Sequence, residues 1–146
     1  MHDVSGGLVP LSEMKGWRVA DGYPDVRGWS VYVERDRVGT VRDLVVDPRT
    51  LDVRFLVVGL KHALLEKERR ATVPIGRAHL GHDDVVYLDA IDASELDTLR
   101  EYDAEQIRAL GNADFAHPDY DQARFWGERP RVGERWFVEE REKEKV

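Results

Sequence analysis

The sequence contains no cysteine. A chain without thiols forms no disulfides, offers no cysteine ligand to zinc or to an iron–sulfur cluster, and has no thiol nucleophile. The absence is compatible with a reducing compartment. The first residues lack the basic start and apolar core of a signal peptide, and no run approaches the ~18 apolar residues of a membrane-spanning helix. We therefore expect a cytoplasmic protein that does not insert into a membrane.

An excess of positive charge is also lacking. The formal net charge is −7, with 22 lysines and arginines against 29 aspartates and glutamates. A protein that binds nucleic acid by neutralising phosphates needs a clustered basic excess. The composition therefore argues against direct nucleic-acid binding. The 146 residues do include 42% hydrophobic side chains, and a domain near this length buries roughly 68–70% of its unfolded surface.

Short apolar runs separated by turn residues dominate the chain up to residue 88. The tetrapeptide Asp47-Pro48-Arg49-Thr50 is typical of a turn, because proline presets φ and aspartate accepts hydrogen bonds from the following amides. Strands of this length and spacing favour a small barrel or sandwich over βαβ units. The predicted strands cover residues 29–34, 38–47, 51–60, 71–75 and 85–88.

The second and third of these strands are apolar at both odd and even positions. A strand with one face in water alternates apolar and polar residues. We therefore expect these two strands to be covered on both faces or interrupted by a bulge. Some other part of the chain, or a partner, must cover the outer face.

Two short helices are predicted after the strands. Ser94, with Asp97 three residues later, resembles a capping box at the start of the first helix. Asp103 and Gln106 repeat the signal, and Gly111 is suited to end the second helix. Beyond that point the chain is rich in charged residues, proline and glycine.

Aromatic side chains stand among the charges of this tail with little periodicity. Such residues are frequent anchors in interfaces, because they bury a large area with few torsions. They either fold back over the outer face of the strands or dock on a neighbouring subunit or another protein, while residues 139–145 are solvated. The candidate interaction residues are Tyr120, Phe125, Trp126, Trp136 and Phe137.

Three stretches carry a family resemblance: "DGYPDVRGWSVYVERDRVGTVRDLVVDPRTLDVRFLVVGL", "ATVPIGRAHL" and "VVYLDAIDASELDTLREYD". They resemble the PRC-barrel family, which includes the cytoplasmic domain of the photosynthetic reaction centre H subunit and the C-terminal domain of the ribosome maturation factor RimM. The resemblance implies a mainly β fold, a small, highly bent antiparallel β-barrel of about six strands followed by short helices and an irregular tail. We expect a flexible N-terminus over 1–10, the barrel over 11–103 and an extension over 104–146.

The three aspartates in the second and third strands and the turn between them, Asp43, Asp47 and Asp52, do not have the spacing of an ordered metal-ligand loop. The family pattern of Gly39, Val41 and Asp43 implies that Asp43 accepts local hydrogen bonds on the barrel. Asp47 and Asp52 flank a turn. A structural role is favoured over catalysis for all three.

The stretch "HLGHDD" is the best candidate for a metal site, because imidazole and carboxylate can act as ligands together. Its position between two strands favours a surface turn instead. The candidate ligands are His79, His82, Asp83 and Asp84.

No G-x-S-x-G, P-loop or dinucleotide-binding motif occurs in the sequence. We expect a non-enzymatic protein with no cofactor that acts as an interaction or assembly module, binds a protein partner and forms a homodimer. One alternative is a small-ligand or metal-binding domain that uses residues 79–84. The other, by analogy with the maturation factor alone, is a factor associated with ribosomes or RNA processing.

Overall fold

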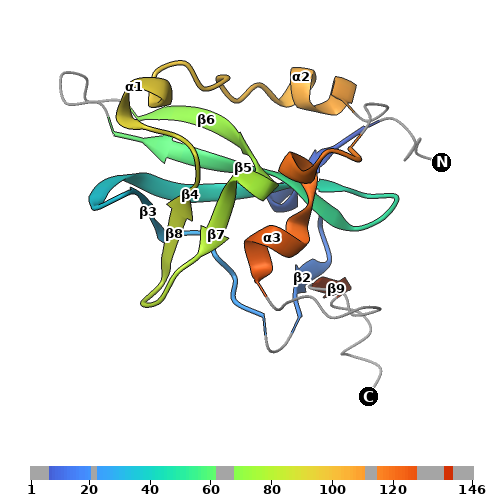
Figure 1. The fold of residues 1–146 in the computed structure, drawn as a ribbon. Helices are drawn as coiled ribbons and strands as arrows, with labels where there is room; N and C mark the ends of the chain where they lie inside the picture. Colours follow the sequence, from blue (N-terminus) through green and yellow to red (C-terminus); the bar gives the residue numbers. More distant parts are fainter. Residues whose placement is uncertain (1–6, 21–22, 62–67, 111–114, 128–136, 140–146) are drawn as a thin grey trace.

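A computed structural model describes residues 7–20, 23–61, 68–110, 115–127 and 137–139, and the architecture is mainly β (Figure 1). The strands are β1 (Val9–Pro10), β2 (Trp17–Val19), β3 (Ser30–Val33), β4 (Asp36–Asp47), β5 (Asp52–Leu60), β6 (Arg69–Pro74), β7 (Ala78–Leu80), β8 (Val85–Leu88) and β9 (Phe137–Glu139). A large sheet has the order β6-β5-β4-β3-β8-β7, with β1 alongside β4, and β2 pairs with β9 in a second sheet.

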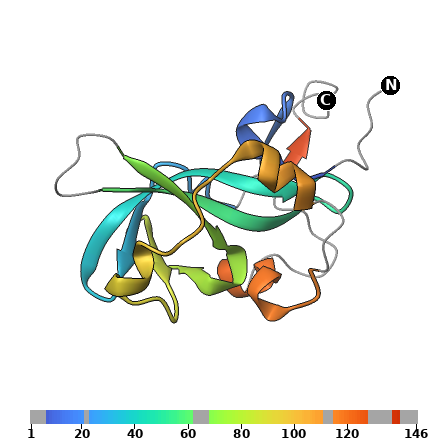
Figure 2. The same cartoon turned by 90° about the horizontal axis from the view of Figure 1, so that it is seen from above.

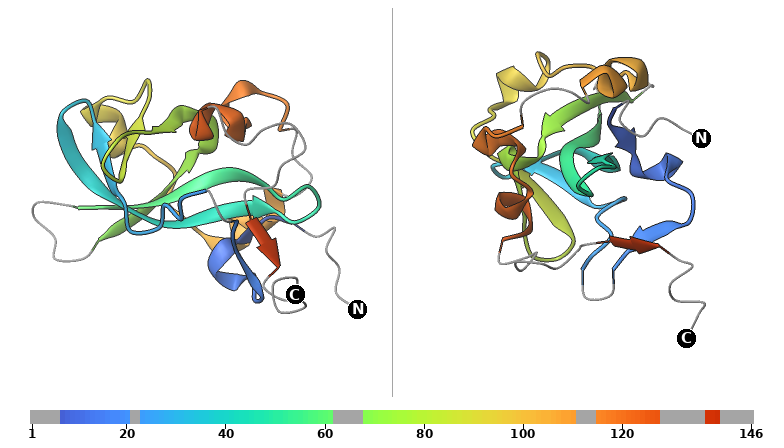
Figure 3. Two further views of the ribbon diagram at one scale, coloured as in Figure 1. Left: turned by 90° about the horizontal axis from the view of Figure 1, so that it is seen from below. Right: turned by 90° about the vertical axis from the view of Figure 1, so that its right-hand side faces the viewer.

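The two edge strands of the large sheet are neighbours in the sequence. β6 ends at Pro74 and β7 begins at Ala78, with the 3-10 turn η3 (Ile75–Arg77) between them. In a flat sheet, strands about 4.8 Å apart would put these edges roughly 24 Å from each other, whereas four peptide steps span at most ~14 Å. The sheet must therefore curl until its edges approach, and it forms a bent half-barrel (Figure 3).

The pairings of the large sheet are antiparallel with one exception. β3 and β8 run parallel, with Val31 opposite Val86. The expected highly bent, mainly β fold of about six strands is confirmed, but the expectation that it is antiparallel throughout is wrong at this pairing. Parallel neighbours need a long connection, and here that connection consists of β4 to β7. No local sequence signal marks such a distant pair.

All five predicted strands are present. The structure adds β7 in the stretch that the sequence analysis assigned to a turn, and it begins β6 at Arg69. Pro74 ends β6 at the edge of the sheet, a position suited to a residue that cannot donate a backbone hydrogen bond to a neighbouring strand.

β4 and β5 are buried on both faces, as their unbroken apolar patterns predict. The main core lies inside the curl, and a separate outer cluster lies on the opposite face. The main core includes Val31, Val41, Leu44, Leu56, Val73, Ile75, Val86, Phe125 and Trp126. The outer cluster consists of Leu8, Val45, Phe55, Val57 and Ile107, with Tyr102, Leu110, Phe115 and Tyr120 packed against it.

The cover of the outer face comes from the same chain. Figure 2 shows helix α2 (Ala104–Ala109) lying across the sheet, and its Ile107 is buried in the outer cluster. The 3-10 turn η5 (Pro118–Tyr120) adds Tyr120, whose ring lies 5.6 Å from that of Phe55 in an edge-to-face arrangement. No second subunit is needed to bury this face.

The pairing of β4 with β5 is irregular at two places and close at a third. The register shifts between Val41 and Asp43 and again between Val45 and Val46, and such bulges increase local twist. A Cβ atom at Gly39 would lie 2.1 Å from the Gly59 carbonyl oxygen. Glycine is therefore required at residue 39 by close backbone approach.

The helix caps agree with the sequence in one case and differ in the other. α1 (Ala93–Leu96) is capped by Asp92, which accepts a hydrogen bond from the Glu95 amide at 3.0 Å. The prediction that Ser94 caps this helix is wrong, because the Ser94 hydroxyl instead donates to Asp92. Asp103 caps α2 as predicted. The predicted C-cap at Gly111 lies outside the described residues.

Helix α3 (Gln122–Trp126) closes the open side of the half-barrel. It lies beside η3, β7 and β5 (Figure 1). Its Phe125 and Trp126 belong to the main core. Both cores therefore include side chains from beyond residue 103, the predicted end of the barrel domain. The remaining short element, η2 (Leu11–Glu13), inserts Leu11 into the main core.

Candidate functional site

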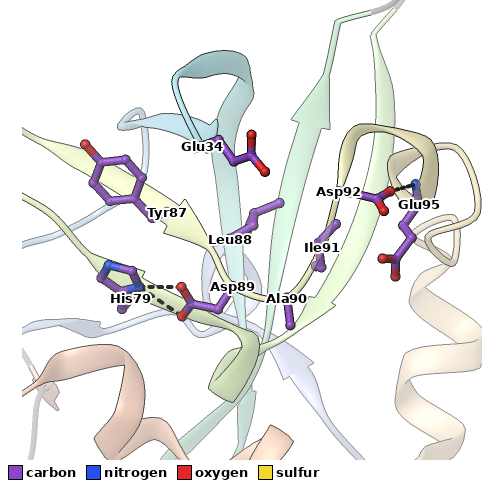
Figure 4. Close-up of a pocket in the computed structure, with 9 residues that line it drawn as sticks. All are labelled: Glu34, His79, Tyr87, Leu88, Asp89, Ala90, Ile91, Asp92 and Glu95. Carbon is purple, nitrogen blue, oxygen red and sulfur yellow. Dashed lines mark hydrogen bonds and ion pairs between the residues drawn. The ribbon is translucent and has the colours of Figure 1, made fainter.

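A groove of about 630 Å³ opens at the end of the sheet where β8 leaves it (Figure 4). We call it the acidic groove, because four carboxylates line it and the only other ionisable lining groups are a histidine and a tyrosine. Its lining residues are Glu34, His79, Tyr87, Leu88, Asp89, Ala90, Ile91, Asp92 and Glu95.

The carboxylates come from three separate parts of the chain. Glu34 stands in the turn between β3 and β4, with a positive φ of 54°. Asp89 directly follows β8, and Asp92 and Glu95 belong to the cap and first turn of α1. Because β3 and β8 are parallel neighbours, their ends lie at the same edge of the sheet, and the acidic side chains meet there.

The side chain of Asp89 is held by His79. The His79 Nδ1 atom lies 2.8 Å and 2.9 Å from the two carboxylate oxygens of Asp89. The imidazole also stacks on Tyr87, with ring centroids 5.4 Å apart. Tyr87 is in turn 6.0 Å from Tyr32. One side of the groove thus carries the stacked rings of His79 and Tyr87, with the Asp89 carboxylate bound to His79.

Asp92 is held in its charged form by its cap contacts. Hydrogen bonds from the Ser94 hydroxyl and from backbone amides lower the pKa of Asp92 below its ordinary value. Arg77 stands at the rim, where its Nη2 atom lies 4.0 Å from Glu95 and donates to the Ala90 carbonyl at 2.6 Å. One arginine at the rim leaves an excess of negative charge. The arrangement attracts a cationic group and offers no nucleophile of an activated kind.

The predicted metal ligands do not converge. His82, Asp83 and Asp84 form the exposed turn between β7 and β8, with positive φ values of 63° and 60° at the two aspartates. His79 is instead engaged with Asp89. Within the described residues, no group of three or more potential ligands could hold a metal ion.

The three aspartates of the strand pair lie in separate, hydrogen-bonded environments. Asp43 is 8% exposed and accepts from the Ser12 hydroxyl at 2.5 Å and the Leu44 amide at 2.8 Å. Asp47, 2% exposed, accepts from the amide and guanidinium of Arg49. These contacts agree with the structural role that the sequence favours.

Asp52 ties the strand pair to the C-terminal part of the chain. Its carboxylate accepts from Gln122 Nε2 at 2.7 Å, while the side-chain Oε1 atom of Gln122 accepts from the Val53 amide at 3.0 Å. Arg54 donates to the Tyr120 carbonyl at 2.9 Å. The start of β5 is therefore the attachment point of η5 and α3.

The aromatic residues of the tail pack within their own chain where the structure describes them. Phe125 and Trp126 are 0% and 4% exposed in the main core, and Tyr120 packs against the outer cluster. The backbone of Phe137 pairs with Val19 in the second sheet. Trp136 lies outside the described residues.

The acidic groove was not anticipated from the sequence. Asp92 was not singled out, because the predicted cap of this helix was Ser94. Glu34, Asp89 and Glu95 are three charged residues among many in the sequence. Only the parallel pairing of β3 with β8 brings their segments together.

The fold and groove define a small, mainly β half-barrel domain closed by a helix and lined at one end by acidic side chains. Residues 18–94 match the PRC-barrel domain family, and the chain belongs to this family. It is also 34% identical over 108 residues to an uncharacterised protein of Deinococcus radiodurans, a match that covers 68% of this chain and 37% of that protein. The chain thus spans just over a third of the relative's length. In the described part of the chain, no helix is both long and apolar enough to cross a bilayer.

Proposed function

We propose that the protein is a non-enzymatic interaction module whose acidic groove binds a positively charged segment of a protein partner. The observation that carries the proposal is the groove itself, a concave surface that combines four carboxylates with an aromatic wall. Arginine and lysine side chains complement both features, through ion pairs and through contacts with aromatic rings. A cytoplasmic location accompanies this proposal and rests on the lack of cysteine.

The electrostatics favour fast and salt-sensitive binding. Each exposed ion pair contributes only about 0.2–1 kcal/mol. Several carboxylates on one concave surface nevertheless act on the same ligand and steer its approach. The net charge of −7 adds a weaker, longer-range attraction. Affinity should therefore fall steeply as salt concentration rises.

A direct test uses a short fluorescent peptide of alternating arginine and serine, with a glutamate–serine peptide as its counterpart. Fluorescence anisotropy should show binding of the basic peptide to the full chain at low salt and none of the acidic one. Chemical shifts of the Ala90 and Glu95 amides should respond if the peptide occupies the groove. Binding with no response of these amides would contradict the proposal.

A matched pair of charge reversals separates the groove from the overall charge. Glu34→Lys places a cation in the groove, whereas Glu101→Lys makes the same change at an exposed residue outside it. Glu34→Lys should weaken binding about three- to tenfold, and Glu101→Lys should have a much smaller effect. Equal weakening by both variants would mean that net charge alone attracts the peptide.

The homodimer is a separate part of the proposal. It was motivated by strands with two apolar faces, and in the described residues the same chain covers both. Three aromatic residues of the tail, Tyr120, Phe125 and Trp126, pack within the same chain as well, so the homodimer rests on the expectation from the sequence alone. Sedimentation over a concentration series should show twice the monomer mass, and a monomer at high micromolar concentration contradicts the dimer.

The metal-binding alternative has a simple test. Calorimetric titration with divalent metals should show no heat that depends on His79 and His82. If the chain binds a metal and the affinity is lost when both histidines are replaced by alanine, residues 79–84 do hold a metal, although their side chains do not converge in this structure. The ribosomal alternative rests on family analogy alone.

A further inference from the structure

A second cavity, of about 410 Å³, lies on the outer face of the sheet. It is bounded by β5 and β6 on one side and by residues 95–110 and Tyr120 on the other. We call it the outer cleft. Its lining residues are Phe55, Thr72, Pro74, Arg77, Glu95, Thr98, Leu99, Arg100, Ile107, Leu110 and Tyr120.

Six of the eleven residues that line the outer cleft are apolar or aromatic, and the other five are polar or charged. Phe55, Ile107 and Tyr120 belong to the outer cluster or pack against it, so the cleft continues that cluster toward the surface. Leu99 and Pro74 add further apolar surface. The volume falls within the roughly 300–1,000 Å³ of small-molecule sites, which combine apolar walls with a few placed polar groups.

The charge of the outer cleft has the opposite sign to that of the molecule. Two arginines and one glutamate line it, giving a formal charge of 2 − 1 = +1 in a chain of net charge −7. Arg77 is already engaged, because it donates to the Ala90 carbonyl and lies near Glu95. Arg100 is therefore the lining arginine that remains to bind an anionic ligand.

Arg100 has a fixed backbone and a free side chain. Its carbonyl accepts from the Thr72 amide at 2.8 Å and lies 3.3 Å from the Thr72 hydroxyl, which anchors the residue at the edge of β6. Its side chain is exposed, and no described residue forms a hydrogen bond or ion pair with its guanidinium. A guanidinium in this position can receive a carboxylate through two parallel hydrogen bonds.

We infer that the outer cleft binds a small amphipathic carboxylate, with its apolar body against Phe55, Ile107 and Tyr120 and its carboxylate at Arg100. The apolar walls account for the body of the ligand and the unpaired guanidinium for its charged end. The acidic groove would repel the same ligand. This site is therefore independent of the proposed peptide site, although Glu95 stands on the boundary between the two cavities.

The first test titrates the full chain with decanoate and, separately, with decan-1-ol, which has the same apolar body without the charge. Arg100→Gln should weaken decanoate binding about tenfold, as expected for loss of a charge-assisted contact, and leave decan-1-ol binding unchanged. Arg124→Gln removes an equal charge from an exposed arginine outside the cleft and should change neither.

Chemical-shift mapping locates the ligand. Decanoate should shift the amides of Ile107, Leu110 and Tyr120 and leave that of Ala90 unmoved. Because Arg100 is exposed, its replacement should not impair folding, so a lost signal reflects binding. Absence of decanoate binding, equal weakening by Arg100→Gln and Arg124→Gln, or shifts confined to other parts of the chain would each overturn the inference.

Glu95→Gln should change the binding of the two ligands in opposite directions. Loss of this carboxylate should strengthen decanoate binding about two- to fivefold and weaken binding of the basic peptide, since the residue lines both cavities. Decanoate affinity that stays unchanged or falls would contradict the assignment of an anion to this cleft. Failure of the peptide arm alone would count against the proposed function and not against this site.

Discussion

The two faces of β4 and β5 are buried by different means. The main core on the inner face draws on β3 to β8 and on α3, and it contains Phe125 and Trp126. The outer cluster has five buried members and is covered by short segments, α2 and η5, that cross the sheet. A sheet that curls can fill its concave side with its own strands, whereas its convex side depends on whatever follows in the chain.

This difference also explains where the cavities lie. Short covering segments leave gaps between them, and the outer cleft is such a gap beside the outer cluster. The main core is closed by Phe125, which is fully buried in it. Loss of stability should therefore be largest inside the curl, and ligand effects should be concentrated outside it.

The largest effect is expected for Phe125→Ala. The ring is 0% exposed, and truncation of a buried phenylalanine leaves a cavity and lowers the free energy of unfolding by about 3–5 kcal/mol. Chemical denaturation measures this loss. Phe125→Leu should recover most of it. If Phe125 served a partner instead of its own core, the monomer would show almost no change.

Ile107→Ala should have a smaller effect. Ile107 is 1% exposed in the outer cluster, and we expect a loss of about 2–3 kcal/mol in the free energy of unfolding, in the lower part of the range for such truncations. The reason is that the site borders the outer cleft and can partly collapse. A loss equal to that of Phe125→Ala would show that the two faces are equally well packed.

Gly76→Ala tests the attachment of η5. A Cβ atom at this residue would lie 2.1 Å from the Pro118 carbonyl oxygen. The segment at 117–120 must then move outward, at a cost of about 1–2 kcal/mol. Amide shifts at Tyr120 and Phe55 should change while those of the main core stay in place. Unchanged shifts at Tyr120 would indicate that η5 is loosely held.

The smallest effect should appear only in acid. Burial raises the pKa of Asp47, but the hydrogen bonds from Arg49 and the charges of Arg49 and Arg54 together lower it by more, so its folded-state pKa lies below the ordinary value. A depressed pKa stabilises the fold above the unfolded-state value of about 3.9, and this contribution is lost as pH falls through the folded-state pKa. Asp47→Asn should therefore lose less stability than the wild type between pH ~5 and ~2.

Arg49→Gln is the companion change for this prediction. It removes the guanidinium that donates to Asp47. The free energy of unfolding of this variant should therefore also fall less between pH ~5 and ~2 than that of the wild type. Urea denaturation at several pH values measures both variants. If both variants lose as much stability in acid as the wild type does, other carboxylates dominate acid unfolding.

Much of the fold was predictable because its signals are local. The turn at Asp47 to Thr50, the apolar strands on either side and the cap at Asp103 each depend on residues close together in the sequence. The prediction at Ser94 was wrong because Asp92, two residues earlier, is an equally good cap and receives the Glu95 amide instead. Local chemistry alone did not decide between them.

The sequence by itself determined that this chain forms strands with two apolar faces, and that something must cover the outer one. Which segment does so was decided only in three dimensions, where α2 and η5 cross the sheet. The parallel pairing of β3 with β8 likewise gathers Glu34 and Asp89 at one edge. The alternation of apolar residues and the chemistry of turns depend on residues that are close together in the sequence. A groove is formed by distant residues, which only the curl of the sheet brings together.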